Sequence, residues 1–133
     1  MAAGTALRYW AIRTLGRLFT YQLAVHNDHK LVTSGPYAAV RHPSYTGAQV
    51  AIVGTALLQL APGSLWAQCI AAGGWAAATA KAFAIVYVAN WAYLWSGGLT
   101  RSSREDHVLR QEFGSEWTAW AERTPYRLYP YLL

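Results

Sequence analysis

The sequence predicts an all-α integral membrane protein that forms a single domain over residues 1–133. Hydrophobic residues make up 54% of the chain and charged residues only 13%, which is about half the charged share of a typical soluble domain. The segment 43–80 contains no charged side chain. There is no alternation of strand and helix patterns and no Gly-x-Gly-x-x-Gly sequence, so a Rossmann domain is excluded.

The positive charge of the chain lies at the ends of its apolar runs. The net charge is +5 and the isoelectric point is about 9.6, and a basic chain of this kind can bind nucleic acid. Here, however, Lys30 and Arg41 precede the uncharged segment, and Arg101, Arg104 and Arg110 follow the last apolar run. This distribution favours anionic lipid headgroups at the ends of membrane helices. We therefore expect membrane lipid as a partner and no nucleic acid.

Residues 6–25 are expected to form an N-terminal helix. Leu7 and Ala11 share one face at helical spacing, and Arg13 and Arg17 lie on the opposite side. Arginine is costly at the centre of a bilayer. The helix is therefore expected to lie in the membrane interface or to form the last turns of a span.

Two membrane crossings are predicted, over residues 44–61 and 79–98. By the positive-inside rule the basic residues at both outer ends belong on the cytoplasmic side, so the number of crossings between them is even. The intervening residues 64–77 are expected to form an extra helix at the far interface. The whole run 64–100 is too long for one crossing, and its weak points are the glycine pair at 73–74 and Lys81.

The segment 29–47 is predicted to form the first half of a functional site. An arginine–histidine pair at 41–42 stands directly before Pro43, where a helix is expected to start because proline fits the first helical position. Free backbone N–H groups at a helix N-terminus bind anions, and a cation beside them adds to this. His26 and His29 are three residues apart, but no third ligand is evident, so no metal site is predicted.

The segment 101–130 is predicted to form the second half of the site. Its polar start at 101–106 is by itself typical of a solvated helix start with acids in the first turn. An amphipathic C-terminal helix follows, with an apolar stripe formed by Leu109, Phe113, Trp117 and Trp120. The two-crossing arrangement brings this segment back to the membrane face that carries the pair at 41–42.

Several segments carry a family resemblance. The core reads Leu-Val-Thr-Ser-Gly-Pro-Tyr at 31–37 and Arg-His-Pro-Ser-Tyr-Thr-Gly at 41–47, and the end reads Phe-Gly-Ser-Glu-Trp at 113–117 and Arg-Thr-Pro-Tyr-Arg-Leu-Tyr-Pro at 123–130. This pattern resembles the isoprenylcysteine carboxyl methyltransferase family, whose members are integral membrane enzymes that use S-adenosylmethionine. Residues 13–20 are similar to the segment that precedes the core in fungal members. The wider group includes phospholipid methyltransferases with a similar Arg-His-Pro segment.

The resemblance implies one substrate contact and a set of cofactor contacts. Arg101, four residues before Glu105, matches the arginine that contacts the substrate in the family. Asp106 departs from the family pattern, which usually shows a second glutamate at this position. The residues implied to contact S-adenosylmethionine are Gln22, His29, Lys30, Leu31, Val32, Tyr37, His42, Pro43, Ser44, Tyr45 and Glu105.

The reaction implied by the resemblance is methyl transfer to the C-terminal carboxylate of a prenylated cysteine. The acceptor would be a prenylated protein or a small prenylcysteine, and the site would face the cytoplasm from the endoplasmic reticulum. A carboxylate is already ionised at neutral pH and needs no general base. Arg101 can clamp it through two parallel hydrogen bonds, which favours this acceptor over an amine.

Two alternatives remain open from the sequence. One is a phospholipid methyltransferase, which acts on an amine. The other is a catalytically inactive, truncated membrane relative, because only 28 residues precede the core segment and family members usually carry more membrane helices there. The sequence also leaves the oligomeric state open.

Overall fold

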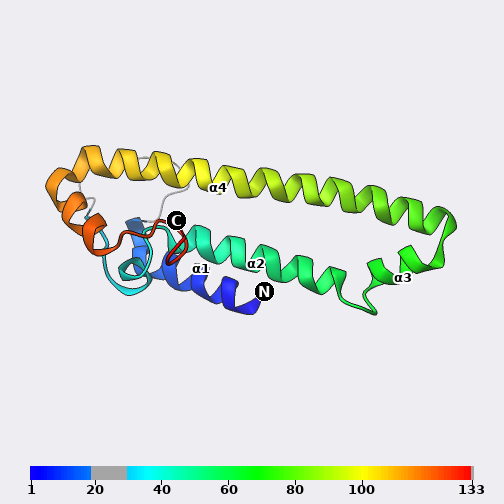
Figure 1. Cartoon of the computed structure of the whole chain (residues 1–133). Coiled ribbons are helices and arrows are strands. Elements are labelled where there is room, and N and C mark those ends of the chain that lie inside the picture. The colour runs from blue at the N-terminus through cyan, green and yellow to red at the C-terminus, as the bar shows by residue number, and fades with distance from the viewer. Residues whose placement is uncertain (19–29, 133) are drawn as a thin grey trace.

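The computed structural model describes residues 1–18 and 30–132, and within these ranges every regular element is a helix (Figure 1). This confirms the all-α prediction. The elements in chain order are α1 (Ala2–Leu15), the short 3-10 helices η1 (Gly16–Leu18) and η2 (Gly35–Ala38), α2 (Pro43–Leu60), α3 (Leu65–Ala72) and α4 (Gly74–Arg123).

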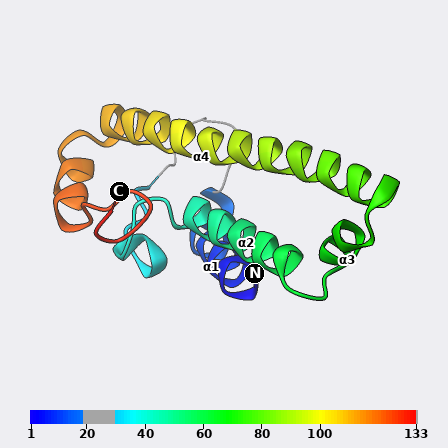
Figure 2. The same cartoon turned by 45° about the vertical axis from the view of Figure 1, so that its right-hand side comes forward.

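The long helix α4 runs antiparallel to α2 in both views of the chain (Figures 1 and 2). As a result, the start of α2 and the second half of α4 lie at the same end of the molecule. After Gly114, whose φ of +50° interrupts the helical path, α4 turns back toward this end. The C-terminal segment (residues 124–132) then packs beside the start of α2 (Figure 2).

Helix α1 packs against α2 at a distance that only glycine permits. A Cβ atom on Gly4 would lie 2.3 Å from the backbone nitrogen of Ala51, and one on Gly47 would lie 2.6 Å from the backbone nitrogen of Arg8. Small residues at such positions let two helix backbones approach closely. The Arg8 guanidinium also donates to the carbonyl and hydroxyl oxygens of Ser44, at 3.2 and 3.3 Å, in the first turn of α2.

The N-terminal helix differs from the predicted range 6–25. It begins at Ala2 and ends at Leu15, because Gly16 adopts a φ of +54°, a left-handed conformation that ends the helix. Residues 19–25 lie outside the described part of the chain.

The helix predicted from Pro43 is present as α2, and the extra helix predicted at 64–77 is shorter than expected. It is α3, which Ser64 caps by accepting a hydrogen bond from the Ala67 N–H at 3.1 Å. It ends at Gly73 and Gly74, which both have positive φ. The predicted break at the glycine pair is therefore confirmed, whereas α4 continues through Lys81 without interruption.

The predicted separation of a spanning segment at 79–98 from a helix that begins after 101–106 is wrong. Both segments belong to α4, so Arg101 and Asp106 lie in the interior of one helix. The polar residues at 101–106 do not interrupt it, because an i,i+4 ion pair from Arg101 to Glu105 fits a continuous helix.

A helix that spans a membrane must be both long enough and apolar enough. Taken one at a time, none of the described helices meets both requirements. The pair α2 and α3, bent by 40° at the break between them, meets both when taken together.

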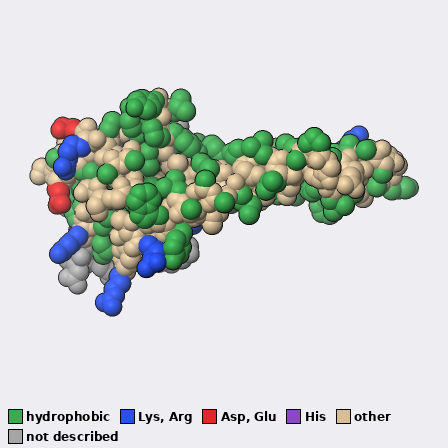
Figure 3. Space-filling view, turned by 90° about the horizontal axis from the view of Figure 1, so that it is seen from below, with side chains coloured by type: hydrophobic (Ala, Val, Ile, Leu, Met, Phe, Trp, Pro, Cys, Tyr) green, Lys and Arg blue, Asp and Glu red, His purple; other side chains and the backbone are tan. Residues whose placement is uncertain are grey.

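Charged side chains gather at one end of the molecule. In the space-filling view most of them lie at the broad end, and a narrow arm with many hydrophobic side chains extends away from it (Figure 3). Between Gly74 and Gly98 the arm's long helix carries a single charged residue, Lys81. The buried hydrophobic cluster lies in the broad end and contains Ala11, Tyr37 and Trp120, with Leu15, Leu31, Val32 and Trp117 packed against it.

Candidate functional site

Backbone hydrogen bonds bring the C-terminal segment against the start of α2. The Arg41 N–H donates to the Tyr126 carbonyl at 2.9 Å, and the His42 N–H donates to the Arg127 carbonyl at 2.9 Å. The C-terminal carbonyls therefore occupy the N–H groups of the two residues that directly precede α2. Residues 41–46 are thereby fixed relative to the end of the chain.

Side chains from three distant segments meet where α2 begins. We call this group the polar cluster. Its members are Arg41, His42, Tyr45, Arg101, Glu105, Asp106 and Arg127.

Arg41 connects α4 to the C-terminal segment. Its Nε and Nη2 atoms donate to Asp106 Oδ2 at 3.3 and 3.2 Å. Its Nη1 atom donates to the carbonyl oxygens of Thr124 and Pro125 at 2.9 and 2.7 Å. A planar guanidinium can satisfy all these acceptors at once, which a lysine ammonium could not do in the same geometry.

His42 lies between the two carboxylates of the cluster. Its ring is buried, with 6% of the residue exposed, and its Nε2 is 2.8 Å from Asp106 Oδ1 while its Nδ1 is 3.4 Å from Glu105 Oε2. Burial alone lowers the pKa of His42, but the hydrogen bonds to Asp106 and Glu105 and their charges outweigh it and raise the pKa above its usual value. The imidazolium form is therefore favoured.

Glu105 receives hydrogen bonds from both helices. Tyr45 OH donates to its Oε1 at 2.6 Å, and Arg101 Nε donates to the same oxygen at 3.2 Å. Burial raises the pKa of Glu105, but the hydrogen bonds from His42 and Tyr45 outweigh burial and hold the pKa below its usual value. For Asp106, too, burial raises the pKa, but the hydrogen bonds and charges of His42 and Arg41 outweigh burial and lower the pKa.

The polar cluster carries an excess of positive charge. With His42 protonated, it contains four cationic side chains and two carboxylates. Such a site favours ligands that bring a carboxylate, and Glu105 adds an acceptor for a cationic or hydroxyl group of the same ligand. This combination fits a ligand that carries both an ammonium and a carboxylate.

The structure brings together four of the residues predicted from the sequence: His42, Tyr45, Arg101 and Glu105. Pro43 is buried and starts α2, and Ser44 accepts a hydrogen bond from Arg8.

Other predicted contacts lie apart from the cluster's hydrogen bonds. Tyr37 belongs to the buried hydrophobic cluster and donates through its hydroxyl to the Ala11 carbonyl at 3.4 Å. Leu31 and Val32 pack against that same cluster, and Lys30 is exposed. Gln22 and His29 lie outside the described residues. The same holds for His26, which was considered with His29 as a metal-binding pair.

Sequence reasoning underrated Asp106 and overlooked Arg127. Asp106 was discounted because it replaces a glutamate, yet it contacts both Arg41 and His42. The adjacency of the two acids at 105–106 was the signal that both act in one cluster. Arg127 lies 3.6 Å from Asp106 and donates to Ser103 Oγ, contacts that only the fold-back of the C-terminal segment creates.

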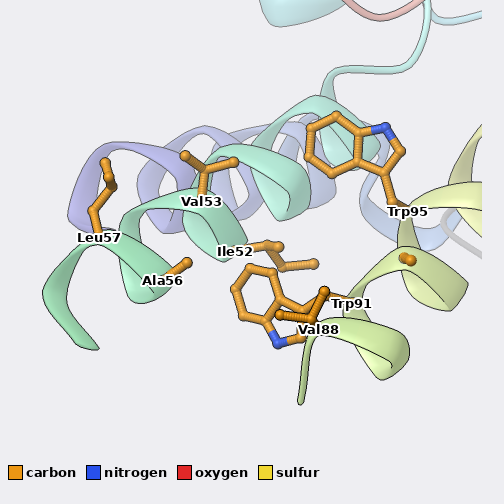
Figure 4. A pocket seen from close by; sticks show the side chains of 8 residues that line it. Ile52, Val53, Ala56, Leu57, Val88, Trp91 and Trp95 are labelled. Atoms are coloured by element: carbon orange, nitrogen blue, oxygen red, sulfur yellow. The ribbon is translucent and has the colours of Figure 1, made fainter. Parts of the chain in front are cut away.

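An apolar groove lies between α2 and α4, the two helices that also carry Tyr45 and Glu105 of the cluster. Its volume is about 300 Å³, at the lower end of pockets that hold small organic ligands. Side chains from the two helices face each other across it (Figure 4), and the lining residues are Ile52, Val53, Ala56, Leu57, Val88, Trp91, Ala92 and Trp95. The groove has no charged residue in its lining, so it suits an aliphatic chain.

Comparison with known proteins gives a consistent result. The model of the isoprenylcysteine carboxyl methyltransferase (ICMT) family matches residues 1–78, a range that contains His42 but ends before Glu105. The chain is 36% identical over 124 residues to protein-S-isoprenylcysteine O-methyltransferase B of Arabidopsis thaliana, covering 92% of this chain and 52% of that protein. It is 32% identical over 122 residues to a probable protein-S-isoprenylcysteine O-methyltransferase of Oryza sativa subsp. indica, covering 90% and 52%.

A weaker similarity extends to an enzyme of another name. The chain is 28% identical over 103 residues to a Delta(14)-sterol reductase of Schizosaccharomyces pombe, of which it covers 19%. No solved structure matches the chain. The chain spans about half the length of the curated methyltransferases it matches. Because the family model covers more than half of its residues, this chain belongs to the isoprenylcysteine carboxyl methyltransferase family.

Proposed function

We propose that this chain transfers a methyl group from S-adenosylmethionine to the C-terminal carboxylate of a prenylated cysteine. The observation that supports this most strongly is that α2 and α4 carry both polar-cluster residues and the lining of the apolar groove. The acceptor would be a prenylated protein or a small prenylcysteine. It carries a carboxylate and an aliphatic chain within a few bonds of each other, as the two sites require.

Arg101 is the proposed clamp for the acceptor carboxylate. It lies on α4 beside Glu105, and its side chain is 40% exposed, so a ligand can reach it. A guanidinium that holds a carboxylate also fixes the direction of the oxygen that reacts. No member of the cluster needs to act as a base, because the acceptor is ionised at neutral pH.

S-adenosylmethionine supplies an electrophilic methyl group on a sulfonium centre. We propose that the cationic groups around His42 hold its carboxylate and that Glu105 accepts from its ammonium or ribose groups. Tyr45 offers an aromatic face beside Glu105. The remaining contacts proposed from the family resemblance are Gln22, His29, Lys30, Leu31, Val32, Tyr37, Pro43 and Ser44.

We also propose that the chain is one integral membrane domain. Its two site segments, 29–47 and 101–130, would face the cytoplasm, and the membrane would be that of the endoplasmic reticulum. The support is the arm of α2, α3 and the first half of α4, whose large apolar side chains are exposed to an extent that soluble surfaces avoid. Phe83 is 69% exposed and Trp75 88%.

The acceptor class distinguishes the proposed function from phospholipid methylation. Membranes that contain the chain would be given labelled S-adenosylmethionine with a farnesylated cysteine or with an aminophospholipid. We expect label in the cysteine product that alkali releases, because a methyl ester is hydrolysed by base and an N-methyl group is not. Alkali-stable label in the lipid would replace our proposal with the amine alternative. Absence of both products would support an inactive relative.

A further inference from the structure

Arg8 is a half-buried arginine on α1 whose guanidinium has no carboxylate partner among the described residues. Its Nη1 atom donates to the carbonyl oxygen of Ser44 at 3.2 Å and to the hydroxyl oxygen of the same residue at 3.3 Å. A guanidinium carries five N–H donors on three nitrogen atoms, so Nε and Nη2 of Arg8 still have donors to offer. By contrast, Arg41 and Arg127 both pair with Asp106. Arg8 is therefore a cation that can take an anionic ligand.

The packing of α1 on α2 fixes the position of Arg8. A Cβ atom on Gly47 would lie 2.6 Å from the Arg8 backbone nitrogen, so the two helix backbones touch beside this residue. The side chain then reaches the first turn of α2, where Ser44 accepts from it. Tyr45 of the polar cluster is the next residue along the helix, and the charges of Arg8 and Arg101 both act on its hydroxyl group. Arg8 thus adds α1 to the helices that surround the site.

The first turn of α2 is an unfavourable place for a cation without a counter-ion. The N-terminus of a helix carries a partial positive charge, which repels a guanidinium and attracts an anion. Nevertheless, the Arg8 guanidinium contacts Ser44 in exactly this turn. An anionic ligand at Arg8 would be stabilised by both the guanidinium and the helix, and it would supply the missing counter-charge.

The proposed reaction brings two carboxylates to the site, one on S-adenosylmethionine and one on the acceptor. The acceptor carboxylate is assigned to Arg101 on α4. Donors at 41–42 are already engaged, because both ring nitrogens of His42 face carboxylates and all three guanidinium nitrogens of Arg41 donate to described residues. Arg8 has unused donors and lies against Ser44, which the family resemblance places among the cofactor contacts. The cofactor carboxylate is therefore the better match for Arg8.

We propose that Arg8 binds the carboxylate of S-adenosylmethionine through the guanidinium nitrogens that Ser44 does not use. This inference rests on the proposed function and deepens it, because it names the cation that holds the amino-acid end of the cofactor. A guanidinium can bind a carboxylate through two parallel hydrogen bonds and so fixes its direction. A lysine ammonium could not serve Ser44 and a carboxylate in the same geometry.

Binding of S-adenosylmethionine and of decarboxylated S-adenosylmethionine to the full chain in detergent tests this directly, because the second compound lacks only the carboxylate. We expect the wild-type chain to bind the first about 10- to 100-fold more tightly, as hydrogen bonds to a charged group allow. In Arg8→Gln the affinity for S-adenosylmethionine falls toward that for the analogue, and the affinity for the analogue does not fall. Arg13→Gln removes the same charge from the exposed side of α1 and keeps the wild-type preference.

Arg8→Lys provides a second variant, which retains the positive charge. Its affinity for S-adenosylmethionine is expected to fall by a smaller factor than in Arg8→Gln, again without loss on the analogue. Equal losses on both compounds in either variant would overturn the inference and leave Arg8 with a packing role. A wild-type chain that binds both compounds equally well would also overturn it.

Kinetics distinguish the cofactor carboxylate from the acceptor carboxylate. At saturating S-adenosylmethionine, Arg8→Gln is expected to keep the wild-type KM for N-acetyl-S-farnesylcysteine. A raised KM with unchanged cofactor affinity would overturn the inference and assign Arg8 to the acceptor. If the wild-type chain binds neither S-adenosylmethionine nor its analogue, the proposed function itself fails, and that result is distinct because it does not depend on residue 8.

Discussion

At the scale of single residues, His42 joins the two halves of the site. Its ring contacts Asp106 and Glu105, which lie more than sixty residues further along the chain. Paired charges of this kind contribute to stability only while each partner keeps its charge. The polar cluster therefore makes the stability of the fold depend on pH.

The direction of this dependence follows from the pKa shifts. The pKa of His42 is raised from 6.5, so its contribution is complete below pH 6.5 and is lost as the pH rises through the folded-state pKa. The pKa values of Glu105 and Asp106 are lowered from 4.5 and 3.8, so their contributions are lost as the pH falls below that range. We expect the melting temperature in detergent to be highest between these limits.

His42→Gln separates the loss of stability at high pH from the loss of stability at low pH. The variant cannot titrate at this position, so we expect a lower melting temperature near pH 6 and no histidine-linked decline above it. If the melting temperature of the variant declined above pH 6.5 as steeply as that of the wild-type chain, His42 would not be the cause of that decline.

Members of the polar cluster could be predicted from the sequence where a motif surrounds them, as for His42 and Glu105. Contacts that depend on the fold-back of the C-terminal segment could not be predicted. Nothing in the sequence around Arg127 or Tyr129 indicates that they contact α4 and α2, because those contacts arise only after α4 bends at Gly114. Gln49, which accepts a hydrogen bond from Tyr129, lies inside an apolar run and carries no local pattern at all.

At the scale of elements, the close packing of α1 on α2 depends on glycine. A Cβ on Gly4 would approach three backbone atoms of α2 at 2.9 Å or less, and backbone cannot move aside as a side chain can. We expect Gly4→Ala to destabilise the fold by about 1–3 kcal/mol, the usual cost of overpacking. Thermal unfolding in detergent measures this.

Gly97→Ala is the matched control for the same chemical change. Gly97 lies on α4 with nothing within 4 Å of an added Cβ, so alanine should be neutral there or stabilise the helix by up to about 1 kcal/mol. Equal effects of the two substitutions would refute the packing argument, since then only helix propensity would be at work.

The element boundaries show what local patterns determine. Pro43 and the glycines near 73 mark a start and a break correctly, because they act through their own backbone geometry. The length of α4 was missed, because charges at 101–106 look like a helix start when their partners on α2 are unknown. The ion pair from Arg101 to Glu105 within α4, and the pairs from Asp106 to Arg41 and His42, outweighed the local pattern.

At the scale of the whole molecule, the charged broad end and the apolar arm divide the chain into two environments (Figure 3). If the arm lies in a bilayer, adding charge to it is costly. We expect the double variant Phe83→Lys, Val86→Lys to lower the fraction of protein that stays with membranes after alkaline carbonate extraction. Both side chains are more than half exposed on α4.

The matched double variant Gln111→Lys, Ser115→Lys adds the same charge to the broad end, at exposed positions. It should remain with the membranes as the wild-type chain does. Release of the wild-type chain by carbonate, or equal retention of both double variants, would count against membrane insertion of the arm.

The central claim is that Arg101 and Glu105 serve different ligands in one site. The most direct measurement is binding of labelled S-adenosylmethionine together with methyl transfer to a farnesylated cysteine, for the wild-type chain, Arg101→Ala and Glu105→Ala. We expect Arg101→Ala to keep cofactor binding and to lose about 10- to 100-fold in kcat/KM, as expected for a lost bond to a charged group. Glu105→Ala should lose both. Cofactor binding that survives in Glu105→Ala would show that Glu105 does not hold the cofactor, and failure of the wild-type chain to bind it would rule out the proposed site.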